Sequence, residues 1–260
     1  MVRVTGREYN GIRASPCFQG GEFSCVSCHS LHNGSRDDQL AQGMRTSAAC
    51  TQCHDWSTAK TESHTHHAIS SSGSHCLNCH MPNTNYGLLK ATRSHTISSP
   101  SIAETVDSGR PNACNLCHLN QTLAWTQTHL SDWYSSPPRT LSDQQATVPA
   151  AALGALTGDA AERAIYYWHM GWQPARDVSG SDWLTPYLAE GLTDTYDAVR
   201  YIAAKSLKAA SDYDYIGPET QRRAARNKIL KAWEPSESFD VELFRKLLAT
   251  RKDPPVKMGE

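Results

Sequence analysis

Four short motifs constrain this chain more than any other feature of its sequence. Each motif has two cysteines separated by two residues and followed at once by a histidine, a pattern written C-x-x-C-H. The motifs are Cys25–His29, Cys50–His54, Cys76–His80 and Cys114–His118. They use eight of the nine cysteines, and all nine lie before residue 120. The first half of the chain must therefore fold around whatever these cysteine pairs bind.

The C-x-x-C-H pattern is the attachment motif of c-type haem. Its two thiols form thioether bonds to the porphyrin, and the adjacent histidine is placed to bind the iron as proximal ligand. Zinc sites also pair C-x-x-C units, but a histidine directly after every second cysteine is not their usual spacing. We therefore predict four covalent haem c groups. The predicted thioether residues are Cys25, Cys28, Cys50, Cys53, Cys76, Cys79, Cys114 and Cys117, and the predicted proximal ligands are His29, His54, His80 and His118.

The composition around the motifs supports a haem core. Residues 20–120 are rich in Ser, Thr, Asn, Gly and His and poor in Leu, Ile, Val and Phe. Such a stretch cannot bury enough apolar surface to offset its conformational entropy. Four macrocycles would supply the missing apolar core, so folding should require haem, as folding requires metal in small metal-binding domains. With so few residues per haem, the haems should pack close together.

Residues 14–135 resemble the superfamily of multihaem c-type cytochromes related to pentahaem, ammonia-forming nitrite reductase. The resemblance is carried by the stretches CVSCHSLH, HTHH, GSHCLNCHMP, RSH and GRPNACNLCH. It implies an exported electron carrier or reductase with bis-histidine haems in close contact. Related reductases often replace the motif histidine of the catalytic haem by lysine, and this chain has histidine in all four motifs.

Distal ligands are sought among the eight remaining histidines, which outnumber the five methionines. His32 follows His29 too closely to reach the far face of the same haem, so it would serve a neighbouring one or lie on the surface. Spaced by three, His64 and His67 would lie on one face if the segment is helical, and could then ligate two different irons. The resemblance favours both of these and His95. The predicted distal ligands are therefore His32, His64, His67 and His95.

The other candidate side chains have simpler interpretations. We expect propionate or solvent contact for His66, a surface position for His75, packing for Met81 and His129, and a buried core position for His169. Cys17 has no cysteine left to pair with inside the chain. A buried small residue, an intermolecular link and a reactive thiol all remain open for Cys17.

The chain changes character after the sequence Ser-Ser-Pro-Pro at residues 135–138. Cysteine disappears, and apolar residues take helical spacing, as in Val199, Ile202, Ala203 and Leu207. We therefore predict a mostly α protein with a haem-cored, irregular tetrahaem domain at 1–140 and an α-helical domain at 141–260. Short helices at 145–233 resemble HEAT repeats, whose helix pairs bury their faces only against neighbours. A generic helical bundle is the alternative.

These features favour an electron carrier over an enzyme. An iron with both axial positions filled cannot bind substrate, whereas a reductase of a nitrogen or sulfur oxyanion, the alternative, needs one open position. The net charge of -1 gives no reason to expect nucleic acid as a partner, and no apolar run is long enough for a transmembrane segment. We expect a periplasmic or extracellular protein whose leader is missing from this sequence. Its partners would be redox proteins, an extracellular electron acceptor, or further copies in a filament.

The first testable prediction is the haem content. Intact-mass measurement of the mature protein should show the chain heavier by four haems, which acid–acetone should not extract because thioether bonds hold them. Three or fewer covalent haems would contradict the interpretation of the motifs.

Overall fold

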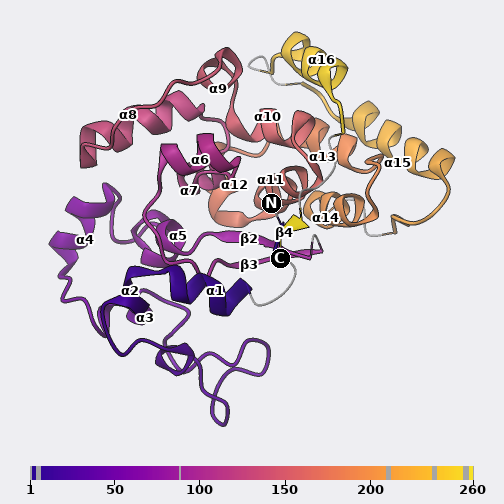
Figure 1. Ribbon diagram of the computed structural model, residues 1–260. Helices are drawn as coiled ribbons and strands as arrows, with labels where there is room; N and C mark the ends of the chain where they lie inside the picture. Colours follow the sequence, from indigo (N-terminus) through magenta and orange to yellow (C-terminus); the bar gives the residue numbers. More distant parts are fainter. Residues whose placement is uncertain are drawn as a thin grey trace. The chain divides into compact units, whose positions relative to one another are not determined.

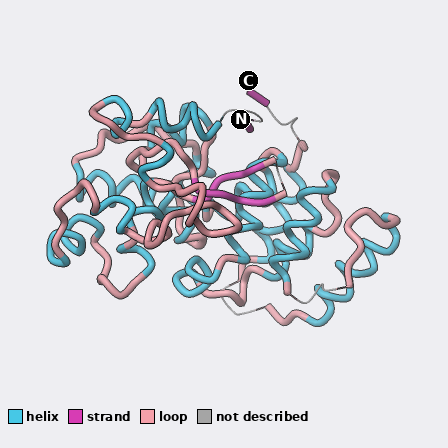
Figure 2. The backbone as a smooth tube through the Cα atoms, turned by 90° about the horizontal axis from the view of Figure 1, so that it is seen from below, coloured by secondary structure: helices cyan, strands magenta, loops and turns pink. Residues whose placement is uncertain are grey.

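The computed structural model describes residues 2–3, 7–87, 89–208, 212–235, 239–253 and 258–259. Within these ranges the chain is mostly helical, with two short two-stranded sheets (Figures 1 and 2). The predicted mostly α fold is therefore confirmed. No helix in the described ranges is both long enough and apolar enough to cross a membrane.

Packing divides the chain into two compact units. The N-terminal unit comprises Thr5–Asn83 and Arg93–Pro100, and the helical unit comprises Met1–Val4, Thr84–Thr92 and Ser101–Glu260. The first three C-x-x-C-H motifs belong to the N-terminal unit, whereas the fourth belongs to the helical unit. The predicted boundary at residue 140 follows composition, and packing places residues 101–140 with the helical half. Whether residues 1–140 and 141–260 fold independently stays a prediction.

The N-terminal unit consists of short helical turns joined by loops. In chain order they are α1 (Arg7–Ala14), α2 (Pro16–Gln19), η1 (Cys25–Ser27), α3 (Ala48–Thr51), α4 (Thr58–Thr65), η2 (Ser72–Ser74) and α5 (Cys76–His80). Among the described residues of this unit, the only buried hydrophobic side chains are Ile12 and Leu77. Two side chains cannot make an apolar core for a segment of this length.

The helical unit begins with strands and continues through a series of helices. Strands β2 (Asn83–Tyr86) and β3 (Lys90–Arg93) form one sheet, and β1 (Val2–Arg3) pairs in parallel with β4 (Met258–Gly259). The helices are α6 (Ile102–Ser108), α7 (Ala113–Cys117), α8 (Leu123–Tyr134), α9 (Asp143–Thr147), α10 (Ala150–Thr157), α11 (Ala160–Gly171), α12 (Gln173–Ser179), α13 (Thr185–Gly191), α14 (Asp197–Leu207), α15 (Glu219–Ala232) and α16 (Val241–Thr250).

A continuous hydrophobic core holds the helical unit together. Helix α10 packs on α11 and α13 packs on α14, while α11 also packs against α14. The predicted apolar stripe of α14 is confirmed, because Val199, Ile202 and Ala203 are all buried. Leu116, within the fourth motif, and Leu119, directly after it, belong to the same core. The fourth motif is therefore packed into the helices that follow it.

One arginine contact recurs at the start of three helices. Arg163 of α11 donates to the Gly158 carbonyl at 2.7 Å, five residues earlier and just before the helix. Arg200 of α14 donates in the same way to the Thr195 carbonyl at 3.2 Å, and Arg222 of α15 donates to the Gly217 carbonyl. In each case the guanidinium closes the loop that leads into its own helix. The same local contact therefore occurs at the starts of α11, α14 and α15.

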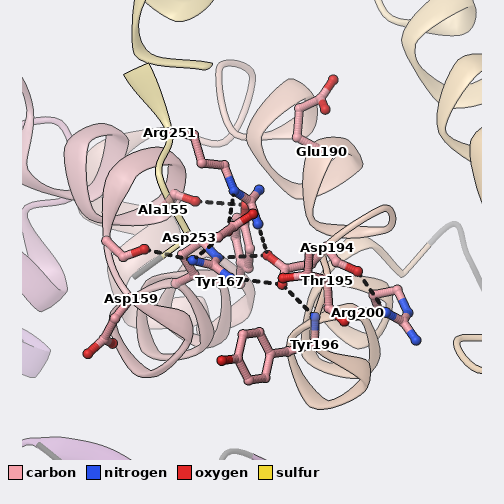
Figure 3. Close-up of polar contacts among 12 residues, drawn as sticks. Ala155, Asp159, Tyr167, Glu190, Asp194, Thr195, Tyr196, Arg200, Arg251 and Asp253 are labelled. Atoms are coloured by element: carbon pink, nitrogen blue, oxygen red, sulfur yellow. Dashed lines mark hydrogen bonds and ion pairs between the residues drawn. The ribbon is translucent and has the colours of Figure 1, made fainter. Parts of the chain in front are cut away.

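A buried ion network ties the end of the chain to these helices (Figure 3). Arg163 donates two hydrogen bonds to the Asp194 carboxylate, at 2.7 and 2.9 Å, and neither side chain is exposed. Arg251, just after α16, donates to the same carboxylate at 2.8 Å. Asp253 lies 3.2 Å from Arg163 and 2.7 Å from Arg251. Because the guanidinium groups of Arg163 and Arg251 both donate to its carboxylate, Asp194 is the central member of this network.

Asp194→Ala should therefore destabilise the helical unit. Removing one partner of a buried ion pair typically costs about 3–5 kcal/mol, because the remaining charge is left uncompensated. Denaturant unfolding followed by far-ultraviolet circular dichroism measures the change. Glu219→Ala is the control, since its pair with Arg223 lies on the surface, and it should leave the transition in place. Equal shifts for the two variants would contradict a special role for the network.

Candidate haem-binding sites

Each C-x-x-C-H motif adopts about one helical turn. The amide of the motif histidine donates to the carbonyl of the first cysteine at 2.9 Å for His29, 3.0 Å for His54 and 2.8 Å for His118, and His80 ends helix α5. Residues three apart in a helical turn lie on the same side. Both sulfurs of a motif can therefore meet one porphyrin. No cysteine of the chain is in a disulfide.

The first three motifs lie in direct contact within the N-terminal unit. Gln52 of the second motif donates to the Ser27 carbonyl of the first at 3.1 Å. Ser47, which precedes α3, accepts a hydrogen bond from the Cys76 amide at 3.2 Å. The thiol of Cys50 is hydrogen-bonded to the sulfur of Cys76, which lowers the pKa of Cys76. The second motif therefore contacts both the first and the third.

His29 and His95 form a facing pair although they are far apart in the sequence. Their ring centroids are 6.2 Å apart and their planes differ by 16°. The Nδ1 atom of His29 lies 3.0 Å from the Asp38 carbonyl oxygen, and that of His95 lies 3.2 Å from the Arg93 carbonyl oxygen. Gly11 of α1 makes room for this segment, because a Cβ there would lie 2.8 Å from the His95 backbone.

His80 and His64 form a second facing pair. Their centroids are 6.1 Å apart and their planes differ by 8°. The Nδ1 atom of His80 lies 3.1 Å from the Ser98 carbonyl oxygen. His64 is carried by α4, and the edge of Trp56 meets its ring with centroids 4.7 Å apart. A histidine that precedes the third motif thus faces the proximal histidine of that motif.

Both spacings fit an iron ion between the rings. Because a metal–imidazole nitrogen bond is about 2.0–2.1 Å long and the ring centroid lies about 1.1 Å behind that nitrogen, two imidazoles on opposite sides of one metal have centroids about 6.2–6.4 Å apart. A carbonyl partner at Nδ1 leaves Nε2 to the metal, as in most metal-bound histidines. The residues present therefore fit two bis-histidine haems. One would be held by Cys25, Cys28, His29 and His95, and the other by Cys76, Cys79, His80 and His64.

Burial favours the neutral form of His95 and of His64. It lowers the pKa of His95, against an opposing effect of Glu8. It also lowers the pKa of His64, and the nearby His80 lowers it further. A lowered pKa favours the neutral imidazole at neutral pH, and only a neutral imidazole can ligate. Burial also raises the pKa of the Cys79 thiol to about 11, which applies before its thioether bond forms.

The arrangement of His67 corrects one prediction. Helix α4 ends at Thr65 and His66 is left-handed, with φ 55°. His67 lies beyond the helix, so the prediction that it shares a helical face with His64 is wrong. The Nδ1 atom of His67 lies 2.5 Å from the Thr65 carbonyl oxygen, and its ring packs on Gly73. It thus has the same carbonyl support as His95, and its role as a ligand stays a prediction.

His32 and His54 are not brought together by the structure. Both are exposed, and no ring contact is described for either. His32 as a distal ligand, and the distal ligand of the second motif, therefore stay predictions. His75, directly before Cys76, is exposed as expected. Cys17, on α2, is partly buried. The pKa of the Cys28 thiol is raised mainly by burial, and the nearby Cys53 and Cys17 raise it further.

The fourth motif lies beside a row of aromatic rings on α8. His118 is 4.9 Å from Trp125, Trp125 is 4.3 Å from His129, and His129 is 4.6 Å from Trp133, all between centroids. His129 thus lies between two tryptophans, which agrees with the packing interpretation. His169 is buried in the helical core beside Trp168 and Trp172, and agrees with the core interpretation.

Sequence reasoning did not find Gly11 and Gly73, which make room for His95 and His67. A glycine in a single sequence carries no signal of the side chain that will approach it. Only the contact itself shows that a Cβ is excluded at these positions.

Comparison with known proteins supports the interpretation of the first two motifs. One family profile, described as the doubled CXXCH motif, matches residues 16–59, which contain the first two motifs. No curated protein and no solved structure shows significant similarity to the chain. The doubled motif supports a multihaem c-type cytochrome, and C-x-x-C-H motifs indicate covalently bound haem c.

Gly73→Ala tests whether His67 ligates. The new Cβ would lie 2.2 Å from the Cδ2 atom of His67, so the ring must move. If His67 binds iron, this variant and His67→Ala should each convert one low-spin haem to high spin, measured by electron paramagnetic resonance. Gly21→Ala is the control, because its Cβ would meet nothing within 4 Å. A low-spin spectrum in both Gly73→Ala and His67→Ala would exclude His67 as a ligand.

Proposed function

We propose that the chain is an electron-transfer protein that carries electrons along four closely packed covalent haems. The observation that carries this proposal is the pair of imidazole couples, His29 with His95 and His80 with His64, at spacings of 6.2 and 6.1 Å. Bound haem supplies a one-electron change at its iron. Histidines on both faces leave that iron no position for a substrate, so exchange of an electron is what remains.

The contacts between motifs support close packing of the first three haems. Gln52 and Ser27 join the first and second motifs, and Cys50 and Cys76 join the second and third. Since every thioether fixes a porphyrin edge at its cysteine, porphyrins at these motifs would have neighbouring edges. The second haem would then lie between the first and the third, in the order of the sequence.

We assign the remaining distal positions to His32 and His67, in keeping with the sequence. His32 belongs to the loop after the first motif, and Nδ1 of His67 contacts a backbone carbonyl oxygen. With these two ligands, all four irons would be bis-histidine ligated and closed.

A reductase of a small nitrogen or sulfur oxyanion is the second candidate. One observation favours it, namely that no ring contact is described for His54. If the second haem has no distal histidine, its iron has an open position for substrate. The two proposals therefore differ in the state of a single haem.

We further propose that the helical unit is a HEAT-like platform for docking. The repeated arginine contact of α11, α14 and α15 and the stacking of α10–α11 beside α13–α14 support this proposal. The chain would act in the periplasm or outside the cell, where c-type haem is attached and used. Its partners would be redox proteins or an extracellular acceptor, with a homopolymeric filament as the alternative assembly.

Distal-ligand variants test the closed-iron proposal. His95→Ala and His64→Ala should each create one high-spin haem that binds cyanide, because each removes one axial ligand. Electron paramagnetic resonance and visible absorption report the change. His75→Ala, which alters an exposed histidine beside the third motif, should leave all haems low-spin. A strong high-spin signal in the unmodified protein that shifts with nitrite or hydroxylamine would instead support the reductase.

A further inference from the structure

One hydroxyl from helix α12 holds both peptide groups that flank His118. The Oγ atom of Ser179 donates to the Cys117 carbonyl at 2.8 Å and accepts from the Leu119 amide at 2.8 Å. Ser179 is 7% exposed and Leu119 is fully buried. Water therefore has little access to these groups, and loss of the hydroxyl would leave a buried carbonyl and a buried amide with weaker pairing.

The backbone between these groups forms a tight turn. His118 has φ -84° and ψ 68°, close to the inverse γ-turn values of about -75° and +65°. The Leu119 amide also donates to the Cys117 carbonyl at 3.0 Å across this turn. Ser179 contacts the same donor and the same acceptor, so it closes the turn from outside. This turn sets the direction in which the His118 side chain leaves the backbone.

Both sides of this contact are rigidly held. On the α12 side, Ala175 is buried in the core, and the indole Nε1 of Trp183 donates to the Ser179 carbonyl at 3.0 Å. On the α7 side, the fully buried Asn115 accepts from Thr126 at 2.8 Å and donates to two further backbone carbonyls. The hydroxyl therefore connects two elements that cannot easily move to compensate for its loss.

We propose that Ser179 is a positioning residue for the fourth haem. Its hydroxyl fixes the backbone of His118, and thereby the orientation of the imidazole toward an iron whose porphyrin is attached at Cys114 and Cys117. Groups that orient an axial ligand tune the electronic state of the metal. The helical unit would thus contribute to the haem site as well as to docking. The inference rests on the proposed function only in requiring that the fourth motif carries haem.

The test compares Ser179→Ala with Ser206→Ala in the full-length, haem-loaded protein. Ser206 is equally buried at 7% exposed, and its side chain lies against Gly171 in the core of the same unit. Intact mass gives the number of haems. Redox titration followed by electron paramagnetic resonance gives the midpoint potential and g-values of each haem. His118→Met, which replaces one axial ligand, identifies the signal of the fourth haem.

Ser179→Ala should shift the potential and g-values of the fourth haem and leave the others unchanged, whereas Ser206→Ala should shift none. Ser179→Thr keeps the hydroxyl and should retain the unmodified values. Should Ser179→Ala mature with the fourth haem alone missing, the positioning role also holds. An unchanged fourth haem in Ser179→Ala, or equal effects of both alanine variants, overturns the inference. Fewer than four haems in the unmodified protein would count against the proposed function instead.

Discussion

Two pairs of imidazole rings bring together the segments that carry the first and third motifs of the N-terminal unit. His29 meets His95, and His80 meets His64, at spacings that match a shared metal ion. These pairs join segments that are 66 and 16 residues apart, in a unit where Ile12 and Leu77 are the only buried hydrophobic side chains among the described residues. We therefore expect haem to take the place that an apolar core has in most domains, so that folding of this unit would be coupled to loading of the cofactor.

The helical unit, in contrast, is stabilised by an apolar core of its own side chains. Its helices bury a continuous apolar core, and Arg163 and Asp194 pair inside that core with no exposure to solvent. The fourth motif lies in this unit, with Leu116 and Leu119 packed in the core. The chain thus combines three attachment motifs in a unit with few buried hydrophobic side chains and one motif in a unit with an apolar core of its own. The fourth motif therefore has a packed apolar surrounding that the first three lack.

Particular residues show how far sequence reasoning reached. The apolar stripe of α14 was predictable, because helical periodicity is a local pattern. The position of His67 relative to α4 was not predictable, because His66 takes a left-handed conformation that ends the helix before His67. A histidine has no strong signal for that conformation, so spacing alone suggested a shared helical face. The composition change near residue 138 was visible, yet packing places residues 101–140 with the later helices. Composition marks where the chain changes character, but it does not show with which unit the helices before that point will pack.

The sequence by itself determined the cofactor class and the residues that attach it. Two cysteines and a histidine within five residues specify their chemistry through local covalent geometry, which needs no knowledge of the fold. The tertiary structure alone decided that His95 faces His29, that His64 faces His80, and that Ser179 holds the turn at His118. These partners are separated by between 16 and 66 residues. Contacts at such separations depend on the path of every intervening loop, and no local pattern in the sequence records that path.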